Sequence, residues 1–117
     1  MKKIFYLKTC STCQKILKEV KPGKDVELQD IKTEKMTPEQ VDAMAKLAGS
    51  YENIFTRKSL KYRSLGLADK KLTEKDYRKL ILEEYTFLKR PVSIIGNEIF
   101  IGNTKAAIEA LKVKLKK

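Results

Sequence analysis

Histidine is absent from this chain of 117 residues, and cysteine occurs only twice. With no histidine and no second pair of cysteines, a four-ligand zinc site would need two carboxylates or a dimer. No apolar run approaches the roughly 20 residues that cross a bilayer, and the opening MKKIFYL is too short for a secretory signal peptide. We therefore expect a cytoplasmic protein with no membrane association, no bound metal and no bound cofactor.

The sequence also lacks internal repeats and low-complexity linkers. Its length fits one domain, since domains commonly hold about 100–150 residues. Hydrophobic residues make up 42% of the chain and are spread along its whole length, which indicates an ordinary folded core rather than disorder. We predict a single domain that spans residues 1–117.

Acidic residues are scarce relative to basic ones: 15 Asp and Glu stand against 26 Lys and Arg, for a net charge of +11. Such a positive field favours anionic partners, among them an acidic protein surface, a small oxyanion or a thiolate. A solvated, lysine-rich surface is the simpler explanation. Basic residues interleaved with aromatic ones are lacking, so we expect no direct nucleic-acid binding.

Three segments near the start of the chain predict a βαβ unit. Residues 2–7 are rich in β-formers, and the helix that follows them ends at the KPG of residues 21–23. Residues 25–31 predict a second strand, parallel to the first because a crossover helix joins them. The helix repeats its apolar residues at Cys13, Ile16, Leu17 and Val20, and the second strand alternates Val26, Leu28 and Asp30 with polar neighbours.

A helical insertion is predicted over residues 37–88. Its first helix begins at TPEQ, with Thr37 as the N-cap of a capping box, and ends at Gly49. The less regular residues 51–71 predict short helices, and another helix begins near Thr73. The apolar residues expected to pack in this insertion are Val41, Met44, Ala45, Leu47, Ile54, Phe55, Leu60, Tyr62, Leu65, Tyr77, Leu80 and Ile81.

The last part of the chain predicts a hairpin and a helix. Residues 92–101 hold two short apolar runs separated by Gly96 and Asn97, which is typical of a two-residue hairpin turn. The final helix follows Gly102 and Asn103. The complete order of strands and helices predicts an α/β fold with a small mixed sheet covered by helices.

The two cysteines, Cys10 and Cys13, form a CxxC motif where the first strand ends and the first helix begins. Free backbone N–H groups at a helix N-terminus favour a thiolate, so the pattern predicts an activated nucleophile at Cys10. Lys8 adds a nearby positive charge. Cys13 lies one helical turn later, close enough to attack a mixed disulfide formed at Cys10.

Two other interpretations of the cysteine pair stay open. Cys13 lies on the apolar face of its helix and could be an inert core residue, and a metal site would need ligands from elsewhere. Permanent disulfides are rare in a reducing cytoplasm, so we do not expect one here. Transient redox chemistry is therefore the main hypothesis.

Several segments together resemble one protein family: TCSTC, FTRKSLKYRSLGL, LKRPVSII and IGNTKAAIEAL. The chain is similar over nearly its full length to the ArsC/Spx/YffB group, which includes glutaredoxin-coupled arsenate reductases and the transcription regulator Spx. The resemblance implies a thioredoxin-like mixed sheet with an inserted helical subdomain. The core would comprise residues 1–36 and 89–117, and the insertion residues 37–88.

The resemblance also implies the site residues. Cys10 matches the family nucleophile, Arg57 the arginine of a central RK segment, and Arg90 the arginine of an RP motif that has a cis bond before its proline. Guanidinium groups suit these roles because they stay charged and bind oxyanions or thiolates through forked hydrogen bonds. Together with Cys13 these are the expected catalytic residues. The expected substrate-binding residues are Lys8, Thr9, Ser11, Thr12 and Pro91.

The activity implied by the resemblance is that of a thiol-dependent oxidoreductase. It would act on a small oxyanion or a disulfide, with glutathione, glutaredoxin or thioredoxin as the reductant. Arsenate reductases of this type carry HNPxC before the cysteine and an arginine near the last hairpin; here YLKTC stands there and no arginine follows Arg90. The alternative is an Spx-like regulator whose Cys10–Cys13 disulfide changes its binding to RNA polymerase.

Overall fold

The computed structural model describes residues 2–116. They fall into two compact units: a core unit of residues 2–35 and 90–116, and a helical unit of residues 36–89. The order of elements is βαβ, helices, ββα, so the predicted order is confirmed. That the two units form a single domain stays a prediction.

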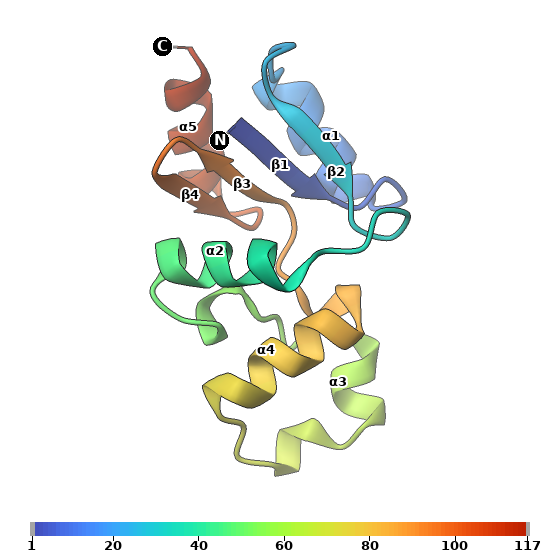
Figure 1. Ribbon diagram of the computed structural model, residues 1–117. Helices are drawn as coiled ribbons and strands as arrows, with labels where there is room; N and C mark the ends of the chain where they lie inside the picture. Colours follow the sequence, from blue (N-terminus) through green and yellow to red (C-terminus); the bar gives the residue numbers. More distant parts are fainter. Residues whose placement is uncertain (1, 117) are drawn as a thin grey trace. The chain divides into compact units, whose positions relative to one another are not determined.

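The core unit is built on a four-stranded mixed sheet with the strand order β2-β1-β3-β4 (Figure 1). β1 (Lys2–Tyr6) pairs in parallel with β2 (Glu27–Asp30), because a helix crosses over between them. β1 also pairs antiparallel with β3 (Val92–Ile95), which forms a hairpin with β4 (Glu98–Ile101). The predicted two-residue turn of this hairpin has Gly96 at a φ of 65°, a left-handed conformation open to glycine.

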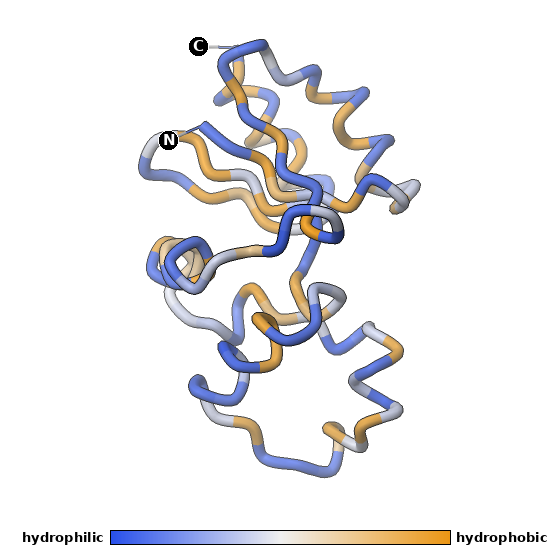
Figure 2. The backbone as a smooth tube through the Cα atoms, turned by 45° about the vertical axis from the view of Figure 1, so that its right-hand side comes forward, coloured by the Kyte–Doolittle hydropathy of each residue, from blue (hydrophilic) through white to orange (hydrophobic). Residues whose placement is uncertain are grey.

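Two helices, α1 (Ser11–Val20) and α5 (Lys105–Leu115), cover one face of this sheet (Figure 1). The core between these helices and the sheet is formed by Ile4, Ile16, Val20, Val26, Ile95 and Leu111. Figure 2 shows hydrophobic residues recurring along the strands. The opposite face of β1 and β3 also carries buried apolar side chains, namely Phe5, Val92 and Ile94.

The second strand departs from its predicted pattern. Leu28 is 44% exposed, whereas Gln29 is only 1% exposed. The alternating pattern shows which residues of β2 share a face of the sheet, but it does not show which face is buried. Because β2 is an edge strand, Leu28 reaches solvent at the margin of the sheet. The Gln29 side chain satisfies part of its polarity by donating to the Glu34 backbone carbonyl at 3.0 Å.

The helical unit contains three α-helices and three 3-10 turns. Helix α2 begins with the predicted capping box, in which Thr37 Oγ1 accepts from the Gln40 N–H at 3.1 Å and Gln40 Oε1 accepts from the Thr37 N–H at 3.0 Å. It ends at Gly49, as predicted. The elements are α2 (Pro38–Ala48), η1 (Glu52–Ile54), α3 (Leu60–Ser64), η2 (Leu67–Asp69), α4 (Glu74–Glu83) and η3 (Tyr85–Phe87).

Aromatic rings form the centre of the helical unit. The Phe55 ring lies 4.8 Å from that of Tyr77, 5.1 Å from that of Phe87 and 6.1 Å from that of Tyr62, measured between centroids. Such contacts stabilise beyond the area they bury. Ile54 and Phe55 are buried as predicted.

Three leucines of the helical unit were wrongly expected to pack inward. Leu60 is 86% exposed, Leu65 53% and Leu47 36%. Helix α3 has only five residues and buries none of them, so its short apolar pattern does not correspond to a packed face. Leu67, after the turn at Gly66, is buried instead.

Candidate thiol site

Cys10 lies between β1 and α1, where it is the N-cap of the helix in an extended conformation, with φ −90° and ψ 115°. The Cys10 N–H donates to the Leu7 carbonyl at 3.0 Å, and the Cys10 carbonyl accepts from the Gln14 N–H at 3.1 Å. These bonds close a turn before the helix and begin its first turn. Both cysteines are free thiols; Cys10 is partly exposed and Cys13 is fully buried.

The surroundings of Cys10 favour its thiolate. Burial raises the pKa of this thiol, but the Cys13 N–H, the Cys13 thiol, the Thr12 N–H and the charge of Arg90 together hold the pKa below its ordinary value. The Cys10 side chain does not form an N-cap hydrogen bond to a backbone N–H of α1. The amides nonetheless stand at the second and third helical positions, where an N-cap side chain finds its donors, and the electrostatic effect does not require a formed bond.

Cys13 has the opposite tendency. Burial raises its pKa to about 11, assisted by the hydrogen bond to Cys10 and the Cys10 charge, while the Leu7 backbone and Arg90 act against the rise. At pH 7 about one Cys13 in 10⁴ would be ionised at that value. Cys13 is therefore a protonated thiol beside Cys10, able to donate a hydrogen bond to the Cys10 thiolate.

The positive charge of Arg90 lowers the pKa of both thiols. Its Nη1 is buried and has no hydrogen-bond partner within residues 2–116. The Arg90–Pro91 peptide bond is cis, and Pro91 is buried. A buried donor without an acceptor is costly, so this nitrogen is suited to an anionic atom from a ligand.

The other predicted binding residues lie in or beside the Cys10 turn. Lys8, Thr9 and Ser11 are exposed, and Thr12 is partly buried with its backbone N–H directed to the thiol site. The sequence suggested that Lys8 adds a positive charge near Cys10, whereas the positive charge that lowers the pKa of Cys10 in the structure is that of Arg90. Roles for these side chains in substrate binding stay predictions.

Arg57 lies in the helical unit and is held there. Its Nη2 donates to Glu52 Oε2 and to the Tyr77 hydroxyl, each at 2.9 Å, and its guanidinium lies 5.9 Å from the Tyr77 ring centre. The Glu52 carboxylate is the main cause that raises the pKa of Arg57. A meeting between Arg57 and Cys10 stays a prediction.

Sequence reasoning overlooked two residues that hold the Cys10 turn. Gln14 Nε2 donates to the Lys8 carbonyl, and Asp30 Oδ1 accepts from the Lys8 N–H at 3.4 Å. The available signals were weak: Gln14 is four residues after Cys10, and Asp30 is the last residue of β2, the strand that pairs with β1. Within the described part of the chain, no group of three or more Cys, Asp or Glu residues could hold a metal ion, and no helix is long and apolar enough to cross a membrane.

A mixed four-stranded sheet with a CxxC motif at the start of its first helix and a cis-proline before β3 defines a thioredoxin-like α/β protein. The chain belongs to the ArsC family, whose model matches residues 5–111. No curated protein matches it.

Solved structures of similar fold cover almost the whole chain. A YffB protein is 21% identical and matches with a TM-score of 0.78, covering 98% of this chain and 99% of its own. A protein of Staphylococcus aureus is 26% identical, with a TM-score of 0.72 and coverage of 94% and 97%. An arsenate reductase from Vibrio cholerae is 16% identical, with a TM-score of 0.73 and coverage of 97% and 96%. These likenesses establish the thioredoxin-like fold.

Proposed function

We propose that this protein is a cytoplasmic thiol–disulfide oxidoreductase in which Cys10 is the nucleophile. The observation that carries the proposal is the position of Cys10 at the N-terminus of α1, where amides and Arg90 lower its pKa. A lower pKa places more of the thiol in its reactive form at neutral pH. Membership of the ArsC family supports the same thiol chemistry.

The first step is an exchange at sulfur. The Cys10 thiolate attacks one sulfur of a substrate disulfide, a Cys10–substrate disulfide forms, and the other substrate sulfur leaves as a thiolate that takes a proton from water. Arg90 would stabilise anionic groups near the reacting sulfur, a role supported by its buried Nη1, which has no hydrogen-bond partner among the residues that the structure describes. An oxyanion that Cys10 attacks would use the same nitrogen.

The second step resolves the mixed disulfide. Either Cys13 attacks the Cys10 sulfur, forming the Cys10–Cys13 disulfide and releasing the substrate thiol, or an external thiol attacks and restores Cys10. Glutathione, glutaredoxin and thioredoxin are the candidate reductants. Burial raises the pKa of Cys13 to about 11, with the Cys10 charge contributing to the rise. The mixed disulfide at Cys10 carries no charge, so this contribution is lost when the intermediate forms and Cys13 ionises more readily there.

Single-turnover reduction of hydroxyethyl disulfide, followed by mass spectrometry with and without glutathione, tests both steps. Cys10→Ala should form no mixed disulfide. Cys13→Ala should still form it, more slowly than wild type because the Cys13 thiol that helps to lower the pKa of Cys10 is gone. Only wild type should go on to an internal disulfide. Equal reactivity of Cys10→Ala and wild type would overturn the assignment of the nucleophile.

A further inference from the structure

The loop before Cys10 is held at one residue by side chains from two different elements. Gln14, on α1, donates to the Lys8 carbonyl. Asp30, at the end of β2, accepts from the Lys8 N–H at 3.4 Å. Both backbone groups of the residue two positions before the thiol are thus bound by side chains.

Asp30 is itself fixed. It is in register with Tyr6, and the Ile31 N–H donates to the Tyr6 carbonyl at 3.0 Å, which continues the β1–β2 pairing past the strand. Its Oδ1 also accepts from the Lys32 N–H at 3.3 Å, and its Oδ2 from the Thr33 hydroxyl at 3.3 Å. The carboxylate is therefore a rigid acceptor tied to the sheet.

We infer that Gln14 and Asp30 are positioning residues that hold the Cys10 sulfur against the first amides of α1. The inference rests on the proposed function, since it concerns activation of the same thiol. The helix fixes the Thr12 and Cys13 amides, while the Leu7–Cys10 turn decides where the sulfur lies relative to them. Because hydrogen bonds weaken steeply with poor geometry, a turn that shifts would lose part of this stabilisation.

The pH profile of Cys10 alkylation by iodoacetamide, with thiolate absorbance at 240 nm, reports on this positioning. Asp30→Asn keeps an acceptor oxygen but loses the charge, whereas Asp30→Ala loses both. Loss of the negative charge alone favours the thiolate and lowers the midpoint. We therefore expect the Ala midpoint to lie above the Asn midpoint by about 0.5 to 1 pH unit, because only Ala releases the turn.

Gln14→Leu keeps the size of the side chain and removes the donor, so it should raise the midpoint by a similar amount. Lys18→Leu, an exposed change further along α1, is the matched control and should leave the midpoint near that of wild type. Circular dichroism establishes that each variant is folded before its profile is taken.

The outcomes separate this inference from the proposed function. A wild-type midpoint at the ordinary value of a cysteine would remove the proposed function. A low wild-type midpoint that Gln14→Leu leaves unchanged, with Asp30→Ala and Asp30→Asn alike, would remove only the positioning roles.

Discussion

At the scale of single residues, the site gives two neighbouring thiols opposite tendencies to ionise. Cys10 is partly exposed and its charged form is favoured, whereas Cys13 is fully buried and its pKa is raised to about 11 by burial first of all. The difference follows from position in the helix: an N-cap side chain meets free amides, but a side chain at the third helical position points into the core. Being close together would not by itself give the two thiols pKa values that shift in opposite directions.

The raised pKa of Cys13 predicts a loss of stability at alkaline pH. Above the ordinary value of 9.0 the unfolded chain releases this proton, while the folded chain keeps it up to about 11. The folded state then binds more protons, so the free energy of unfolding falls between these pH values, by at most about 2–3 kcal/mol. Urea unfolding at pH 8 to 11 should show a steeper decline for wild type than for Cys13→Ala. Parallel declines would contradict the assignment.

Replacing Ser93 with alanine should stabilise the protein. Its side-chain hydroxyl is buried and has no hydrogen-bond partner within residues 2–116. Burying an unpaired hydroxyl costs about 1–3 kcal/mol, so Ser93→Ala should raise the midpoint of urea unfolding. Ser93→Thr, which keeps the hydroxyl and adds a methyl group, serves as the comparison. A lower midpoint for Ser93→Ala would mean that the hydroxyl is satisfied by bound water.

At the scale of elements, local chemistry made most boundaries predictable from the sequence. The Thr37 N-cap, the helix start near Thr73, the stop at Gly49 and the turn at Gly96 each depend on one or a few residues, and the structure has all of them. The inward face of α1 followed from helical spacing in the same way. The burial of side chains in β2 and α3 could not be predicted from the sequence. At a sheet edge or on a five-residue helix, burial depends on which other elements pack against the segment.

The capping box of α2 gives a prediction at this scale. Thr37→Ala removes the oxygen that accepts the Gln40 N–H, so it should lower the free energy of unfolding by about 1 kcal/mol. Thr37→Ser retains the oxygen and should lose much less. Urea denaturation of the three proteins measures the difference. Equal losses in the two variants would show that the methyl group, rather than the cap, is responsible.

For the whole molecule, the site was only partly accessible from the sequence. The CxxC motif located Cys10 and Cys13, and the family resemblance pointed to Arg90, whose charge lowers the pKa of both thiols. Gln14 and Asp30 were missed because their partner is the backbone of Lys8, and a sequence does not display which loop carbonyl or amide a side chain will meet. Arg57 and the binding roles of the exposed loop side chains stay predictions.

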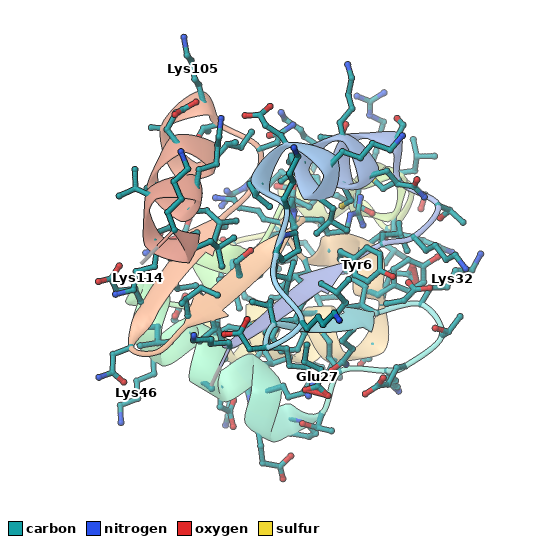
Figure 3. The ribbon with its side chains drawn as sticks, turned by 90° about the horizontal axis from the view of Figure 1, so that it is seen from above. Tyr6, Glu27, Lys32, Lys46, Lys105 and Lys114 are labelled. Carbon is teal, nitrogen blue, oxygen red and sulfur yellow. The ribbon has the colours of Figure 1, made fainter. Side chains whose placement is uncertain are left out.

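The net charge of +11 should select among disulfide substrates of the proposed reaction. Lysines such as Lys32 and Lys105 extend outward from the core unit (Figure 3), so the field reaches into solvent around it. At low ionic strength, oxidised glutathione, an anion, should react with Cys10 faster than cystamine, a cation, because a positive field concentrates anions.

Stopped-flow rates with both disulfides, from about 0.02 to 0.5 M salt, provide the measurement, since screening shortens the reach of exposed charges over this range. The glutathione rate should fall and the cystamine rate should rise as salt is added. Neutral hydroxyethyl disulfide is the control and should change little. If all three disulfides shared one salt dependence, the charge of the molecule would have no part in substrate choice, and selection would depend on contacts at the thiol site alone.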